Sequence, residues 1–195
     1  MQNRRDFIKS ASVFSAMMAA APTIVSAQGA ARTFKVAVIG SGRRASEAFT
    51  NMAEAAKKMG HAIQLVAAHD FFLEEAQRRC KQFGCDEKFA FGGGDGYFKM
   101  LEVPGIEIVI LGAPPAFRPR HLDACIKAGK HVFAEKPIAV DPQGVRHVLE
   151  SAAAAKAKQL TLVTGTQRRH QGAYMRQALA FQKGQLGTIR GGNIY

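Results

Sequence analysis

Short apolar runs alternate along this chain with longer segments of helical periodicity, and this alternation restricts the fold more than any other feature. The runs cover residues 34–39, 63–68, 87–91, 106–111, 132–134 and 160–163. Most of them are apolar at consecutive positions, so both faces of each predicted strand must be buried. Strands of this kind, separated by helices, predict an α/β fold: a doubly wound parallel sheet covered by helices on both sides.

Helical segments fill the intervals between these runs. They cover residues 46–59, 73–83, 97–101 and 119–128, and another begins at residue 142. A glycine ends three of them, and Asp141 followed by Pro142 has the chemistry of a helix start. No internal repeat or long linker interrupts the pattern, so we expect one domain over residues 33–167.

Composition limits the classes of partner. A chain of 195 residues can form one domain with a full core but not two. The formal net charge of +12 is compatible with an anionic partner. The basic residues are scattered over predicted helix faces, however, and no basic stretch alternates with aromatic residues at a spacing that suits base stacking. We therefore expect no nucleic-acid partner.

The sequence contains three cysteines, Cys80, Cys85 and Cys125. No C-x-x-C pair is present, so we expect no structural metal site. Cys80 and Cys85 either form a disulfide in an oxidising compartment or pack as thiols on helix faces.

The first 27 residues have the layout of an export signal. The charged sequence NRRDFIK precedes an uncharged, alanine-rich segment, and the small residues at 25–27 suit signal-peptidase cleavage. The paired arginines resemble a twin-arginine signal, which exports folded proteins. The alternative is an uncleaved anchor, but serines and Pro22 make this segment only weakly apolar, so no stable membrane span is expected. We predict a periplasmic protein with the twin-arginine machinery as a partner.

Chemically distinctive residues follow the predicted strands. In a doubly wound sheet, ligands bind beyond the carboxyl ends of the strands. The residues expected at that edge are Gly40, Ser41, Gly42, Asp70, Ala113, Pro114, Glu135, Lys136, Gln167 and Arg168.

The first strand is followed by a G-x-G-x-x-A pattern that begins at Gly40. Its glycines allow a sharp turn and a close approach of the backbone to a pyrophosphate, while the next helix presents N–H donors. The pattern has a strand before it, a helix after it and an acid, Asp70, after the second strand. Together these features predict a Rossmann-type NAD(P)-binding domain over residues 33–167.

Asp70 and two arginines bear on which dinucleotide binds. A carboxylate at position 70 would accept hydrogen bonds from ribose hydroxyls and repel a 2′-phosphate, which favours NAD. Its alternative role is that of a turn residue at the start of a loop. Arg43 and Arg44 could pair with a 2′-phosphate or with the pyrophosphate, so NADP remains possible.

Lys136 lies between Glu135 and Pro137 at the end of a predicted strand. The proline keeps Lys136 out of a helix, so we expect the lysine to point into the crevice. There it could exchange a proton with a substrate hydroxyl or only orient it, and Glu135 could hold it in place. The alternative is a solvated loop lysine.

Several motifs resemble those of the Gfo/Idh/MocA family, typified by glucose–fructose oxidoreductase and inositol dehydrogenase. The sequence AEKP, preceded by AGKHVF, carries most of the resemblance, and VIGSGRRA, Asp70, GAPPAFRPRH and GTQRRHQGAY support it. The resemblance covers residues 35–195. Where many members have glycine this chain has Ala45, which the fingerprint tolerates.

This resemblance implies a role for each matching residue. The loop at 40–44 and Asp70 would hold the dinucleotide, and Lys136 would touch both the nicotinamide ribose and the substrate hydroxyl. Gln167 and Arg168 would flank the cofactor or substrate entrance. The residues implied on the nicotinamide side are Ala113, Pro114 and His121.

The resemblance also implies a second, α+β domain that carries the substrate pocket and an aspartate–histidine pair. We expect residues 168–195 to begin that domain, so that this chain is the nucleotide-binding half and is inactive alone. The full-length protein is expected to be a homo-oligomer, because family members associate through the sheet of the second domain.

Three functions remain open from the sequence. The first is an NAD(P)-dependent oxidoreductase that acts on a hydroxyl of a sugar or polyol and keeps its cofactor tightly bound, as export would require. The second is a redox-neutral, NAD-dependent glycosidase. The third is a nucleotide-binding fragment without catalysis.

Overall fold

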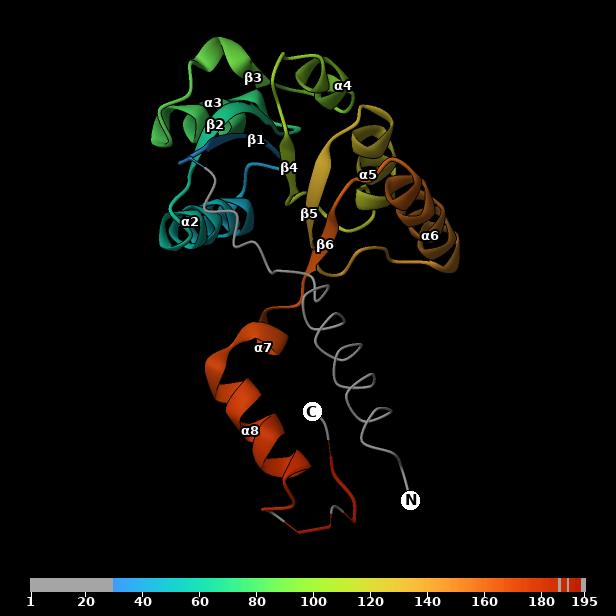
Figure 1. Cartoon of the computed structure of the whole chain (residues 1–195). Helices are drawn as coiled ribbons and strands as arrows, with labels where there is room; N and C mark the ends of the chain where they lie inside the picture. Colours follow the sequence, from blue (N-terminus) through green and yellow to red (C-terminus); the bar gives the residue numbers. More distant parts are fainter. Residues whose placement is uncertain (1–29, 186, 189, 194–195) are drawn as a thin grey trace, which may run out of the picture. The chain divides into compact units, whose positions relative to one another are not determined.

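A parallel sheet forms the centre of the part of the chain that the structure describes. The computed structural model describes residues 30–185, 187, 188 and 190–193, so the predicted export signal lies outside the described residues. Six parallel strands follow the order β3-β2-β1-β4-β5-β6 (Figure 1). They are β1 (Thr33–Ile39), β2 (Ala62–His69), β3 (Ala90–Phe91), β4 (Ile108–Leu111), β5 (His131–Glu135) and β6 (Leu162–Gly165). The predicted doubly wound α/β fold is confirmed, and its switch point lies between β1 and β4.

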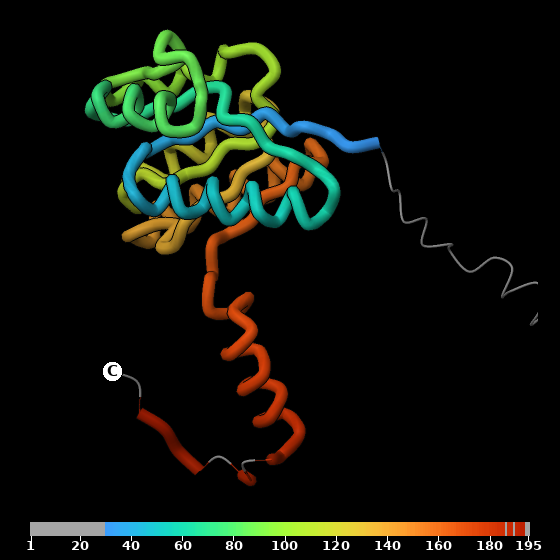
Figure 2. Tube along the Cα trace, turned by 90° about the vertical axis from the view of Figure 1, so that its left-hand side faces the viewer, coloured from blue at the N-terminus to red at the C-terminus, as the bar shows by residue number. Residues whose placement is uncertain are grey.

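Five helices connect the strands of the sheet, namely α2 (Arg43–Lys58), α3 (Leu73–Gln82), α4 (Gly96–Leu101), α5 (Arg118–Lys127) and α6 (Pro142–Ala157). Two more, α7 (Gln167–His170) and α8 (Gly172–Gln182), follow the last strand, β6. Figure 2 follows the chain from β1 through α2 into β2, which is a parallel crossover. The Asp141 side chain accepts a hydrogen bond from Gly144 N at 2.6 Å, so the predicted start of α6 is confirmed. α8 buries none of its side chains. The assignment of residues 168–195 to a second domain stays a prediction.

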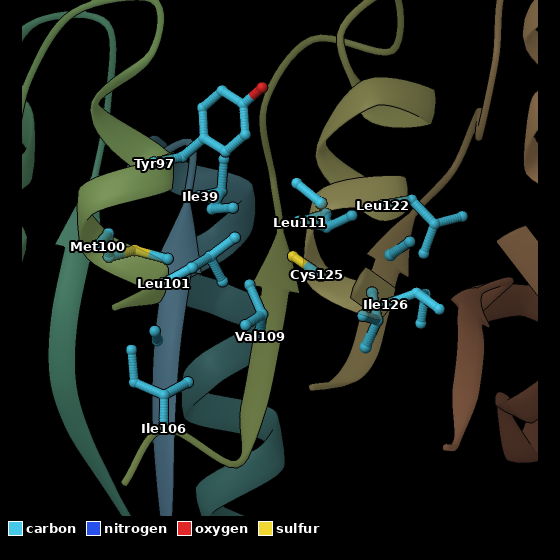
Figure 3. Packing of buried hydrophobic residues seen from close by; sticks show 14 of the residues in the cluster. Ile39, Tyr97, Met100, Leu101, Ile106, Val109, Leu111, Leu122, Cys125 and Ile126 are labelled. Carbon is cyan, nitrogen blue, oxygen red and sulfur yellow. The ribbon is translucent and has the colours of Figure 1, made fainter. Parts of the chain in front are cut away.

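The consecutive apolar residues of the strands serve two separate cores. In β1, Val36 and Val38 pack in one cluster with residues of α2 and α3. Ala37 and Ile39 face the other way and join a cluster formed with α4, α5 and α6. Figure 3 shows part of this second cluster, in which α4 and α5 contribute side chains above β1 and β4. Both faces of the central strands are therefore covered, as the sequence predicted.

The structure corrects several predicted boundaries. The strand predicted at 87–91 is a 3-10 turn, η1 (Glu87–Phe89), followed by the two residues of β3. The Asp86 side chain accepts a hydrogen bond from Lys88 N at 3.0 Å and so stabilises a turn where a strand was expected. β4 and β6 each begin two residues later than predicted, because apolar residues such as Ile106 are buried outside the hydrogen-bonded ladder.

Cys80, Cys85 and Cys125 are buried free thiols, so the alternative Cys80–Cys85 disulfide does not form in this structure. Cys80 and Cys125 pack on helices as predicted, whereas Cys85 lies in the connection between α3 and η1. Among the described residues, no helix combines the length and apolar character that crossing a membrane requires.

Candidate functional site

A cavity of about 560 Å³ lies at the carboxyl edge of the sheet. Five of the predicted site residues line it, namely Gly40, Asp70, Ala113, Pro114 and His121. The other lining residues are His69, Phe71, Phe72, Gly93, Gly94, Asp95, Phe117 and Arg120. The remaining predicted residues lie at or after the same strand ends but do not line this cavity. They are Ser41, Gly42, Arg43, Arg44, Glu135, Lys136, Gln167 and Arg168. The structure therefore groups His121 with Asp70 in one cavity and leaves Lys136 outside it.

The two fingerprint glycines meet different demands. Gly40 has φ +83°, and a Cβ at this position would lie 2.2 Å from Ala113 N, so the fold itself requires glycine there. At Gly42 a Cβ would meet nothing within 4 Å. Protein packing therefore does not explain this glycine, whereas a ligand that closely approaches the open backbone would. The open space beside Gly42 leaves room for the predicted dinucleotide.

Ala45 fits the third fingerprint position because its neighbour is also small. Ala45 is fully buried, and a Cβ on Gly112 would lie 2.6 Å from the Ala45 Cβ. The close contact between α2 and the end of β4 is thus achieved by an alanine on the helix and a glycine after the strand. The departure from the family pattern leaves the packing intact.

Asp70 connects the second strand to the fingerprint loop. Its Oδ2 accepts a hydrogen bond from Ser41 N at 2.7 Å, and its Oδ1 accepts one from Phe72 N at 3.2 Å. The bond to Phe72 is that of a turn residue, so Asp70 has this role as well as its place in the cavity wall. Each carboxylate oxygen keeps acceptor capacity for the hydroxyls of a ribose.

Arg44 and Arg43 differ in their surroundings. Arg44 pairs with Glu47 at 2.5 Å and with Glu135 at 2.6 Å. The Arg43 side chain is 87% exposed and has one long contact of 3.7 Å with Glu47. Two carboxylates therefore engage Arg44, while Arg43 keeps donors available for a phosphate.

The expectation that Glu135 holds Lys136 was wrong. The buried Glu135 carboxylate binds Arg44 instead, and its Oε2 has no hydrogen-bond partner among the described residues. Lys136 is exposed, and none of the hydrogen bonds or ion pairs of the described residues involves its ammonium group. The physical reason is that the Arg44 guanidinium of α2 already pairs with the buried carboxylate, whereas Lys136 lies beyond the end of β5.

Sequence reasoning missed two buried arginines that bind backbone carbonyls of the site. Arg118 donates to Glu135 O at 2.8 Å and also to Pro137 O, so it contacts the backbone on both sides of Lys136. Arg79 donates from Nε to Ser41 O at 3.0 Å. Its position was readable, because it falls on the apolar stripe of α3 beside Ala76 and Cys80. Arg118 lies within the GAPPAFRPRH motif, which by itself indicated no role for this residue.

Two histidines and a tyrosine form a buried cluster beside the cavity. The ring centroids of Tyr97 and His121 are 4.6 Å apart, and those of His69 and His121 are 6.3 Å apart. His69 Nδ1, His121 Nδ1 and Tyr97 OH have no partner among the described residues. Burial, followed by the charges of His69 and Arg120, lowers the pKa of His121 to about 4. Burial also lowers the pKa of His69, so both rings are neutral at pH 7.

Gln167 and Arg168 follow β6 at the start of α7. With its amide oriented to match its neighbours, Gln167 donates to Gly165 O and accepts from Arg44 Nη2, each at 3.1 Å. The Arg168 guanidinium lies 5.3 Å from the centre of the Tyr174 ring. Gln167 thus joins the Arg44–Glu135 pair, whereas Arg168 contacts the next helix.

Comparison with known proteins now adds to this geometry. The model of the Gfo/Idh/MocA family, an oxidoreductase family with an NAD-binding Rossmann fold, matches residues 34–164. The chain belongs to the Gfo/Idh/MocA oxidoreductase family. Its sheet and fingerprint loop are those of the NAD-binding Rossmann domain of this family.

The proteins to which this chain is similar in sequence include dehydrogenases and reductases. The chain is 33% identical over 125 residues to an inositol 2-dehydrogenase of Pseudomonas syringae, which covers 64% of this chain and 35% of that enzyme. It is 31% identical over 113 residues to a dTDP-3,4-didehydro-2,6-dideoxy-alpha-D-glucose 3-reductase of Actinomadura kijaniata, covering 57% and 32% of the two chains. These matches span about a third of the length of either relative.

Solved structures of a reductase and a dehydrogenase share the fold. A 3-ketoreductase from Actinomadura kijaniata in complex with NADP aligns with a TM-score of 0.65 and 25% identity, over 81% of this chain and 46% of that one. A myo-inositol 2-dehydrogenase from Lactobacillus plantarum aligns with a TM-score of 0.66 and 22% identity, over 80% and 43% of the two chains.

Proposed function

We propose that this protein acts as an NAD(P)-dependent oxidoreductase on a hydroxyl, or the corresponding carbonyl, of a sugar or polyol. One observation carries the proposal: in a chain of this family, the fingerprint loop, Asp70 and the strand end that bears Lys136 meet at one edge of the sheet. The substrate class is supported by the relatives, which are named for inositol and for a dideoxy sugar nucleotide.

In this proposal each residue has a distinct part. The open backbone at Gly42 accommodates the pyrophosphate, and the carboxylate of Asp70 accepts hydrogen bonds from a ribose. Lys136, exposed and without a protein partner among the described residues, is free to donate a hydrogen bond to the substrate hydroxyl or to exchange a proton with it. The bound nicotinamide supplies the hydride chemistry.

Within this proposal NAD is favoured over NADP. The Asp70 carboxylate would repel a 2′-phosphate. Arg44 already forms ion pairs with Glu47 and Glu135. Arg43 could still pair with a 2′-phosphate. The similar 3-ketoreductase was crystallised with NADP, so both dinucleotides belong in the test.

We also propose export through the twin-arginine route to the periplasm, with the cofactor loaded before export, and homo-oligomerisation of the full-length protein. Export rests on the charged NRRDFIK sequence, the alanine-rich segment and the small residues at 25–27. Fusion of residues 1–32 to a reporter that is active only when it is folded before export would test it. Loss of reporter export in an Arg4→Lys, Arg5→Lys variant is expected, and unchanged export would refute the twin-arginine route.

The first test of function is to purify the chain from cytoplasm, denature it and identify released nucleotide by mass spectrometry. Near-stoichiometric NAD or NADP is expected, and Asp70→Ala should release less. Oxidation of sugars and polyols is then measured on the longest reading frame that contains this chain, with Lys136→Met as the comparison. Aglycone release from a glycoside with no net redox change would instead favour the glycosidase, and a folded chain that neither carries nor binds nucleotide would contradict the proposal.

A further inference from the structure

Arg79 lies beneath the fingerprint loop on the side away from solvent. It belongs to α3, and only 5% of its surface is exposed. Its Nε and Nη2 donate to Ser41 O at 3.0 Å and 2.5 Å, and Nη2 also lies 3.3 Å from Gly42 O. A third nitrogen, Nη1, donates to the Gln82 side chain. The fork of the guanidinium therefore fits the carbonyls of this loop.

The charge of Arg79 has no close counterion. None of the ion pairs within 4.0 Å in the described part of the chain includes it. A buried cation without an anionic partner is costly, even where carbonyl oxygens solvate it. The carboxylates of Glu75 and Asp70 act on this charge only from beyond ion-pair distance, so an anion that arrives nearby stabilises it further.

Planarity of the peptide links this contact to the opposite face of the loop. In a trans peptide, the C=O of Ser41 and the N–H of Gly42 point in opposite directions. Because Arg79 binds Ser41 O from below, the N–H of Gly42 points away from Arg79. A Cβ at Gly42 would meet nothing within 4 Å, and α2 begins at the next residue with its unpaired N–H groups.

We propose that Arg79 is a positioning residue for the dinucleotide pyrophosphate. Its guanidinium fixes the Ser41–Gly42 peptide so that the N–H donors of the loop face the phosphates, and its positive charge complements them from behind. The proposal rests on dinucleotide binding by this family's Rossmann domain and is independent of the substrate.

Three variants separate charge, geometry and general stability. Arg79→Met keeps the apolar stem but removes both the charge and the donors. Arg79→Lys keeps the charge but replaces the planar fork with a single ammonium group. Arg78→Met is the matched control, because the neighbouring Arg78 side chain is 65% exposed and pairs only with Glu75 among the described residues.

The first readout needs no nucleotide. Backbone ¹⁵N order parameters of the free chain report whether the loop amides are fixed. In Arg79→Met we expect the values for Gly42 and Arg43 to fall from about 0.85 to below about 0.6, with core amides such as that of Ile110 unchanged. Unchanged loop order parameters would overturn the proposal.

The second readout compares NAD with adenosine, which lacks the pyrophosphate, by titration calorimetry. Loss of a charged hydrogen-bonding group predicts about tenfold or greater weakening of NAD binding in Arg79→Met, with adenosine affected less than about twofold. Arg79→Lys should bind NAD with intermediate affinity, and Arg78→Met should match the wild type. Equal weakening of both ligands would mean a general structural role and overturn the proposal. A wild-type chain that binds neither would refute the proposed function, while the order parameters would still decide whether Arg79 fixes the loop.

Discussion

Arg44 Nη2 lies 2.6 Å from Glu135 Oε1, and this ion pair joins the first turn of α2 to the last residue of β5. The two side chains are unequally buried, since that of Glu135 is 3% exposed and that of Arg44 is 39% exposed. The pair therefore connects the fingerprint helix to the strand end that precedes Lys136.

Substitutions of Arg44 and of Glu135 should lower the free energy of unfolding by different amounts. Arg44→Ala leaves a buried carboxylate without its partner and should lower the free energy of unfolding by about 2–3 kcal/mol, less than for a fully buried pair because Arg44 is partly exposed. Glu135→Gln keeps a hydrogen-bond acceptor and should cost about 1 kcal/mol. Urea unfolding of the single and double variants measures the coupling energy between Arg44 and Glu135. Strictly additive losses of stability would contradict a stabilising ion pair.

The two fingerprint glycines should separate folding from binding. Gly40→Ala forces a side chain into positive φ and against Ala113 N, so we expect a loss of at least about 2 kcal/mol in unfolding free energy. Gly42→Ala meets only open space and should cost less than about 1 kcal/mol. It should nevertheless weaken NAD binding strongly. Thermal unfolding measures the stability of both variants, and titration with NAD measures their affinity. Full NAD affinity in a folded Gly42→Ala variant would contradict the proposed role of Gly42 in binding.

Stability should fall as the pH is lowered through the range in which His121 titrates. Its folded pKa of about 4 lies below the ordinary value of about 6.5, so the unfolded chain binds more protons between these limits. His121 therefore contributes its full stabilisation above about pH 6.5 and loses it towards pH 4. Burial of His69 acts in the same direction.

The loss attributed to His121 should reach about 2 kcal/mol between pH 6.5 and pH 5. Urea unfolding across this range measures it, and His121→Gln should make the dependence shallower. An equally steep dependence in the His121 variant would show that other groups are responsible.

Substitution of Arg118 should mainly lower stability, whereas substitution of Lys136 should mainly lower activity. Arg118→Met removes both hydrogen bonds to the loop around Lys136 and leaves two buried carbonyls unpaired, which should destabilise the fold by about 2–4 kcal/mol. Lys136→Met changes an exposed side chain and should alter stability by less than about 0.5 kcal/mol. On the longest reading frame, Lys136→Met should nonetheless abolish turnover. Stable, fully active Lys136→Met protein would exclude the proposed role of this lysine.

Much of the fold was predictable because its signals are local. The apolar runs identified six strands, and their two-sided burial required helices on both faces. Where the prediction was wrong, at residues 87–91, a single aspartate, Asp86, stabilised a turn that hydrophobicity alone cannot reveal. The site was predictable to the extent that strand ends in a parallel sheet share one edge, which grouped Gly40, Asp70 and Ala113.

The sequence by itself determined the sheet, the fingerprint loop and the set of residues beyond the strand ends, because periodicity and turn chemistry act over a few neighbouring residues. Only the tertiary structure decided which side chains meet. Glu135 pairs with Arg44, 91 residues away, and Arg79 reaches Ser41 across 38 residues. Such pairs depend on the direction of each side chain and on the burial of its charge, and these follow from the packing of whole elements.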